Sequence, residues 1–152
     1  RKISNIRKKD FLNVGHSKTR INFKYNEIKT QNKIEKKEFK FIKKRILKLS
    51  QLSNQIGAES IFVTQRSLRW KKVDEKIFSI DQNNYFEKEK IISDLILETC
   101  EENYLKCVNG FGNLKINKND TYDLIHTNPS GSKKISNFIY SKIKDFIVNN
   151  YD

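Results

Sequence analysis

A short, continuous apolar run, Ile61-Phe62-Val63, constrains the fold of this chain more than any other feature. Segments with helical periodicity precede and follow it, which is typical of a strand with both faces buried in a parallel sheet. Lys106-Cys107-Val108 has the same setting later in the chain. The order helix, strand, helix, strand, helix predicts an α/β fold with parallel strands and right-handed crossovers. The length of 152 residues is enough for one domain with its own core.

Helical periodicity occurs in three segments. We expect the first helix over Glu35 to Ile56, with Gly57 just past its end, where a positive φ costs little. The second is expected over Tyr85 to Tyr104, and the third from Ser130 or Gly131 to Val148. The predicted apolar stripe of the first helix consists of residues at steps of three or four: Phe39, Ile42, Ile46, Leu49, Ser53 and Ile56.

The remaining segments lack a clear period. Residues 1–33 form a poorly defined basic segment, in which the alternation of Ile21, Phe23 and Tyr25 suggests a short extended piece. Ser67 to Ile80 and Gly110 to Asn119 are interpreted as loops. Because two parallel strands form a poor core on their own, either a third strand lies between Phe11 and Tyr25 or the chain is part of a larger domain.

Asp123 and His126 are a pair of titratable residues that stand next to a strong turn signal. The aspartate lies three residues before the histidine, and the turn Asn128-Pro129-Ser130-Gly131 follows. With this spacing a carboxylate can accept the imidazole Nδ1–H, which fixes the tautomer of a histidine that acts as a general base. A histidine side chain, with an ordinary pKa of about 6.5, suits proton transfer near neutrality. The alternative is an ordinary loop histidine before a helix-capping turn.

The run from Asp123 to Ser136 resembles the last sequence block of the SGNH, or GDSL-type, hydrolases, which reads D-x-x-H, then a Pro-containing turn with a Gly, then the final helix. Leu49 to Gln65 and Tyr85 to Val108 are similar to helix–strand units of the same family, so the resemblance covers roughly the last two-thirds of the chain. It implies a three-layer α/β/α fold of the flavodoxin-like type, and hydrolysis of an acyl or acetyl ester by a nucleophilic serine. It also implies His126 as the general base and Asp123 as the residue that orients it, with no metal and no cofactor.

The serine and oxyanion blocks of that family have no counterpart in this sequence. Gly15-His16-Ser17 is the nearest match to a Gly-Asp-Ser block, but no apolar strand precedes it, and it is interpreted as a loop. We therefore expect this chain, residues 1–152, to be a single domain or the C-terminal part of one, with the nucleophilic serine upstream of Arg1 and no turnover by the fragment alone. No role is expected for His16.

Ligands of open α/β sheets gather at the carboxyl ends of the strands. Gln65 and Arg66 follow the first predicted strand, and Arg69 and Trp70, the only tryptophan, lie in the loop beyond. These residues are the candidate pocket for a small or polymeric ester substrate. The alternative for Trp70 is a lid packed over the end of the sheet.

The formal net charge of +13 favours polyanionic partners. The alternative function is therefore a catalytically inactive or non-enzymatic basic module that binds nucleic acid or another polyanion through the lysine-rich face of the first helix. Lysine is interleaved with glutamate on several helices, however, and a solvated helix face explains the same pattern. Nucleic acid is therefore the less favoured partner.

The spacing of Cys100 and Cys107 fits neither a metal site nor a redox motif. We expect both as buried free thiols, as in a reducing compartment, and a cytoplasmic location if the chain is complete. No apolar run approaches the roughly 20 residues that cross a bilayer, so no transmembrane segment is predicted. The sequence leaves the oligomeric state open.

Overall fold

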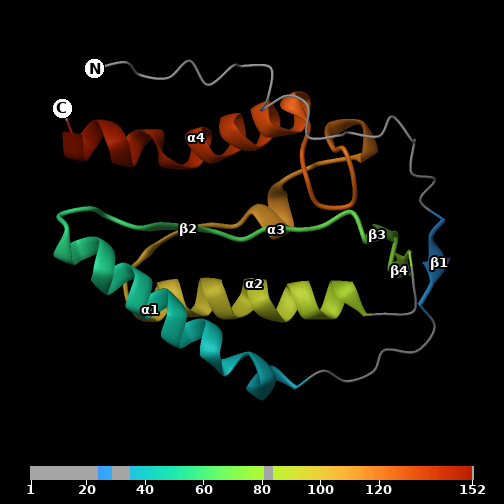
Figure 1. Ribbon diagram of the computed structural model, residues 1–152, viewed down its shortest axis with the longest axis horizontal. Coiled ribbons are helices and arrows are strands. Elements are labelled where there is room, and N and C mark those ends of the chain that lie inside the picture. Colours follow the sequence, from blue (N-terminus) through green and yellow to red (C-terminus); the bar gives the residue numbers. More distant parts are fainter. Residues whose placement is uncertain (1–23, 29–34, 81–83, 152) are drawn as a thin grey trace, which may run out of the picture.

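The computed structural model of this protein describes residues 24–28, 35–80 and 84–151 (Figure 1). Strands β2 (Ile61–Val63) and β5 (Lys106–Val108) form a parallel sheet, in which Ile61 pairs with Lys106 and Val63 with Val108. Both strands coincide with the predicted apolar runs. The described chain is therefore of mixed α/β class with a small parallel sheet, as the alternation of segments predicts.

Helices lie on both sides of this sheet. In Figure 1, α1 (Lys40–Gln55) and α2 (Tyr85–Glu102) lie on one side of β2, and α4 (Pro129–Tyr151) lies on the other. α1 and α2 pack against each other. The apolar side chains buried within the described residues are Ile46, Leu68, Trp70, Ile77, Ile91, Cys100 and Val108. No helix in this part of the chain combines the length and the apolarity needed to cross a membrane.

The predicted first helix is confirmed, and a short 3₁₀ turn, η1 (Lys36–Phe39), precedes α1. The helix ends in a Schellman motif. Gly57, at φ 73°, donates its N–H to the carbonyl of Asn54 at 3.1 Å, and Ala58 donates to the carbonyl of Ser53 at 3.0 Å. The role predicted for Gly57 as the residue past the helix end is therefore confirmed.

The predicted apolar stripe of α1 is only partly correct. Ile46 and Ser50 are the buried residues of this helix, and they lie one turn apart on the same face. Leu49 and Ile56 are instead 55% and 81% exposed. The reason is that α1 is covered mainly by α2, along the face that carries Ile46 and Ser50.

A β-hairpin occupies the segment from Ser67 to Ile80, where the sequence predicts a loop. Strands β3 (Trp70–Val73) and β4 (Lys76–Ser79) pair in antiparallel register, and the turn between them contains Asp74 at φ 52°. The loop prediction is therefore wrong for most of its length. The sequence of β3 does not resemble a strand, because Trp70 is its only buried residue and apolar and polar residues do not alternate along it.

The expected third strand between Phe11 and Tyr25 lies almost entirely outside the described residues. The nearest described strand is β1 (Asn26–Glu27), which pairs in antiparallel register with β4 and not with the parallel sheet. The second predicted loop contains two short helical turns, α3 (Gly110–Asn113) and η2 (Lys118–Asp120). The second and third predicted helices are confirmed, although α4 is longer than expected at both ends.

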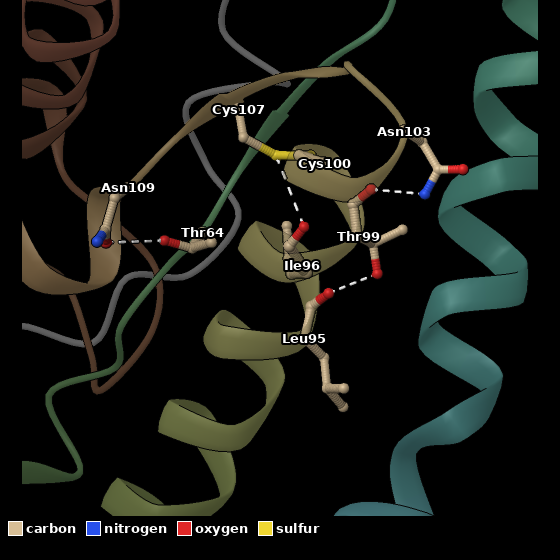
Figure 2. Close-up of a disulfide and its surroundings, with 8 residues drawn as sticks. All are labelled: Thr64, Leu95, Ile96, Thr99, Cys100, Asn103, Cys107 and Asn109. Carbon is tan, nitrogen blue, oxygen red and sulfur yellow. Dashed lines mark hydrogen bonds between the residues drawn. A yellow bond between two sulfur atoms is a disulfide. The ribbon is translucent and has the colours of Figure 1, made fainter.

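Cys100, in the last turn of α2, and Cys107, on β5, form a disulfide (Figure 2). Their Cα atoms are 6.1 Å apart, a distance that such a bond readily spans. The expectation of two free thiols is therefore wrong, and the inference of a reducing compartment that rested on it loses its basis. The bond attaches the end of α2 to the strand that follows it in the chain.

Candidate active site

Asp123 and His126 lie in a loop that closes on itself shortly before α4. Thr121 and Thr127 form an antiparallel bridge at the base of this loop. Above the bridge, the N–H of Tyr122 donates to the carbonyl of His126 at 2.8 Å. These bonds hold the five residues between the two threonines as a compact unit, which we call the His126 loop.

The carboxylate of Asp123 organises this loop. Its Oδ1 accepts the N–H groups of Ile125 and His126, each at 2.7 Å, and its Oδ2 lies 2.7 Å from Nδ1 of His126. The hydrogen bond from the backbone of His126, then the one from its imidazole, lower the pKa of Asp123 to about 2. The structure thus brings together the pair that the spacing predicts, while the catalytic role of the pair stays a prediction.

The ionised Asp123 determines the tautomer of His126. A carboxylate has no proton to donate, so Nδ1 of the imidazole must carry the hydrogen of their bond. In the neutral ring, Nε2 then has a free lone pair and can accept a proton. The side chain of His126 is 75% exposed, so Nε2 is open to a reactant.

Asp120, the second acid near the histidine, has a different role. Its buried carboxylate accepts hydrogen bonds from Nζ of Lys134 at 2.8 Å and from the N–H of Asn117 at 3.1 Å. The hydrogen bond from Lys134 is the main cause of the lowered pKa of Asp120. Because Lys134 belongs to α4, Asp120 attaches the base of the His126 loop to this helix, and the acid that contacts the histidine is Asp123.

The first turn of α4 packs directly against Asp120, at the base of the His126 loop. Gly131 approaches so closely that a Cβ at this position would lie 2.0 Å from the carbonyl oxygen of Asp120. Asn128 caps the helix, since its Oδ1 accepts the N–H of Gly131 at 3.0 Å. Pro129 suits the first helical position because it has no N–H that needs a partner. The Asn-Pro-Ser-Gly turn therefore positions the loop as well as starting the helix.

A cavity of about 400 Å³ lies beside His126, between the end of β2, the His126 loop and α4. The N–H of Leu68 donates to the carbonyl of Leu124 at 2.8 Å, which joins the segment after β2 to the loop. Much of the wall is apolar, including Leu68, Leu114, Leu124, Ile135, Phe138 and Ile139. The polar lining residues are Thr64, Gln65, Arg66, Thr121, His126 and Thr127.

Of the predicted pocket residues, Gln65 and Arg66 line this cavity, whereas Arg69 and Trp70 do not. Trp70 is 4% exposed, and its ring packs edge-on against Phe86 with centroids 4.8 Å apart. The guanidinium of Arg69 lies over the ring of Tyr85, with Cζ 4.7 Å from the centroid. These two residues lie outside this cavity because the chain leaves the sheet edge at this point and enters the hairpin. Their assignment to a substrate pocket stays a prediction, and the burial of Trp70 agrees with the alternative of a packed side chain.

Thr64 and Asn109 directly follow β2 and β5 and meet at the same end of the sheet (Figure 2). Oγ1 of Thr64 donates to Oδ1 of Asn109 at 3.3 Å and accepts the N–H of Phe111 at 3.0 Å. A Cβ on Gly110 would lie 2.3 Å from the carbonyl oxygen of Thr64. Thr64 was not among the predicted site residues, although its position directly after a buried strand was the available signal.

Within the described ranges, no group of three or more His, Cys, Asp or Glu side chains is arranged to hold a metal ion. Comparison with protein-family models gives no match, and comparisons with curated proteins and with solved structures give none either. The geometry around Asp123, His126 and the adjacent cavity is therefore the main evidence for function.

Proposed function

We propose that this chain supplies the acid–base part of a serine ester hydrolase of the SGNH type. The contact between Asp123 and His126 carries the proposal, because it places an ionised carboxylate on Nδ1 and leaves Nε2 open. The nucleophilic serine is expected on a segment upstream of Arg1, as the sequence resemblance implies. The substrate is a carboxylic ester with an acyl or acetyl group.

Each proton in the proposed reaction passes through Nε2 of His126. The serine hydroxyl attacks the ester carbonyl while Nε2 takes its proton, and Asp123 stabilises the imidazolium that forms. The imidazolium then gives this proton to the leaving alcohol. Water attacks the acyl-enzyme with Nε2 as the base, and the carboxylic acid leaves as the serine regains its proton.

The arrangement of the helices supports this proposal. We infer a three-layer α/β/α domain of flavodoxin-like type, in which β2 and β5 are neighbouring strands of a parallel sheet with helices on both sides (Figure 1). The hydrogen bond from Leu68 to Leu124 holds the His126 loop next to the segment that follows β2. Open α/β sheets bind their ligands at this end of the strands.

The cavity beside His126 also fits an ester substrate. Its largely aliphatic wall suits the hydrocarbon part of an acyl group or an alcohol, and its size is in the range of small-molecule sites. His126 lies on the polar part of the wall, so a bound ester can place its carbonyl near Nε2 and its chain against α4.

A fluorophosphonate probe tests the proposal, because it reacts with serine hydroxyls that a neighbouring base activates. The full-length protein is treated with the probe, and mass spectrometry locates the labelled peptide. We expect one labelled serine in the wild-type protein and no labelling of His126→Ala. His16→Ala is the matched control, since it removes the other histidine of the chain, and it should be labelled like the wild type.

Equal labelling of His126→Ala and the wild type would show that His126 activates no serine. The alternative, an inactive or non-enzymatic basic module, draws on the exposed lysines of α1: Lys40, Lys43, Lys44 and Lys48. It predicts that no serine is labelled and that the protein binds DNA or RNA with an affinity that falls steeply as salt rises.

A further inference from the structure

Arg66 gives the cavity beside His126 a permanent positive charge. Among the described lining residues it is the only lysine or arginine. Its guanidinium lies over the ring of Trp70, with Cζ 4.3 Å from the centroid, and Nη2 donates a long hydrogen bond of 3.5 Å to the carbonyl of Trp70. Burial lowers the pKa of Arg66, but an arginine keeps its proton in proteins. The cavity wall therefore contains a partly desolvated cation.

Glu89 is the acid whose charge acts on Arg66, but its carboxylate already accepts hydrogen bonds from other residues. Its Oε1 accepts the hydroxyl of Ser67 at 2.5 Å, and its Oε2 accepts the N–H of Ser67 at 2.9 Å and Nε1 of Trp70 at 2.8 Å. Glu89 influences Arg66 through charge alone. Within the described residues Arg66 makes no ion pair with a carboxylate, and its buried Nε–H has no hydrogen-bond partner.

Thr121, on the same cavity, also has unsatisfied hydrogen-bonding capacity. Its Oγ1 is buried and has no partner among the described residues. A buried polar group without a hydrogen bond destabilises the folded state. Nε of Arg66 and Oγ1 of Thr121 both lack a hydrogen-bond partner, and both residues line the same cavity. After small shifts of these side chains, a polar group of a ligand can supply the missing hydrogen bonds.

We propose that this cavity binds an aliphatic carboxylate, with the carboxylate paired to Arg66 and the hydrocarbon chain against Leu114, Ile135 and Phe138. A guanidinium binds a carboxylate through two parallel hydrogen bonds, which gives both affinity and orientation. As a statement about substrate class the inference rests on the proposed hydrolase function: the preferred ester is aliphatic and carries a second, free carboxylate. As a binding site it does not require turnover.

Calorimetric titration of the full-length protein with octanoate tests the site. Fluorescence of Trp70, the only tryptophan in the sequence, is a second readout, because its ring stacks on Arg66. We expect octanoate to bind, octanol to bind much more weakly, and Arg66→Gln to weaken octanoate binding by about tenfold or more. Arg66→Lys, which keeps the charge but not the planar fork, should lose less.

Arg69→Gln is the matched control, because it removes the same charge from a residue that lies outside the cavity. It should bind octanoate like the wild type. Three results would overturn the proposal: no octanoate binding, equal affinities of octanol and octanoate, or equal losses in Arg66→Gln and Arg69→Gln. Octanoate binding without serine labelling would support the carboxylate site and contradict the hydrolase proposal. Serine labelling without octanoate binding would support the hydrolase proposal and contradict the carboxylate site.

Discussion

Nζ of Lys134 lies 2.8 Å from Oδ2 of Asp120, and this contact joins α4 to the base of the His126 loop. The side chain of Asp120 is 3% exposed, whereas that of Lys134 is 47% exposed. A buried carboxylate needs this partner more than the partly solvated lysine does. The position of the proposed general base therefore depends on an ion pair between residues that lie 14 positions apart.

Lys134→Met should lower the melting temperature at neutral pH by several degrees, because it leaves the carboxylate of Asp120 buried without its cation. The folded-state pKa of Asp120 is lowered, so the ion pair stabilises the fold above the unfolded pKa of about 3.9 and loses this effect as the pH falls. The difference between variant and wild type should therefore shrink below about pH 4. Lys133→Met, the neighbouring exposed lysine of α4, is the control for net charge. A difference that did not change with pH would mean that only the lysine stem matters.

Asp123 should titrate near pH 2 in a carbon-detected NMR titration of its carboxyl group. Because this pKa lies below the unfolded value of about 3.9, ionisation of Asp123 stabilises the fold above pH 3.9, and this effect is lost as the pH falls through 2. His126→Ala should raise the pKa only in part, since the backbone N–H groups of residues 125 and 126 still donate to Oδ1. A pKa at the ordinary value in the wild type would show that the loop is not closed in solution.

Gly131→Ala should destabilise the protein by about 1–3 kcal/mol, because its Cβ has to displace backbone and not a side chain. The Cβ would lie 2.0 Å from the carbonyl oxygen of Asp120, so the start of α4 and the His126 loop must separate. Gly112→Ala is the matched control, since its Cβ would meet only the side chain of Asn109, at 3.2 Å. Urea unfolding of both variants measures the difference, and equal losses would contradict the close approach at Gly131.

Replacing both Cys100 and Cys107 by alanine should lower the free energy of unfolding by about 2 kcal/mol, as expected when a short loop is no longer closed in the unfolded state. The sequence separation is 7, which keeps the effect small. Urea unfolding of the wild type with a thiol reductant should give the same midpoint as the double variant. If the reductant left the wild-type midpoint unchanged while the variant was less stable, packing and not the bond would account for the loss.

Features that depend on neighbouring residues could be predicted from the sequence. The three long helices follow from apolar residues at steps of three or four, and the role of Gly57 follows from its place past a helix end. The contact between Asp123 and His126 is also local, because three residues in a closed loop are enough to bring the side chains together. These features needed no knowledge of what lies elsewhere in the fold.

Features that depend on distant partners could not be predicted in this way. The disulfide requires that the end of α2 return to β5, and the exposure of Leu49 depends on which face α2 covers. In the hairpin, β3 lacks alternation because Trp70 is its only buried residue. In β4, Ile77 and Ser79 are buried, but four residues are too short a run to reveal the alternation. Arg69 lies outside the cavity beside His126 because the hairpin carries it away from the sheet edge, and a segment predicted as a loop gave no sign of this.

Asp123 and His126 should behave as one unit in kinetics with the full-length protein and a short p-nitrophenyl ester. His126→Ala is expected to lower kcat/KM by at least about 10³-fold, and Asp123→Asn by about 10²- to 10⁴-fold, because an amide can leave the imidazole in the wrong tautomer. The double variant should be no slower than His126→Ala alone, since Asp123 acts through the imidazole that it contacts at 2.7 Å. Asp145→Asn, which alters an exposed acid of α4 that does not line the cavity, should leave the rate unchanged. Losses from Asp123→Asn and His126→Ala that simply multiplied in the double variant would mean that the two side chains act separately, and the proposed orientation of His126 by Asp123 would have to be abandoned.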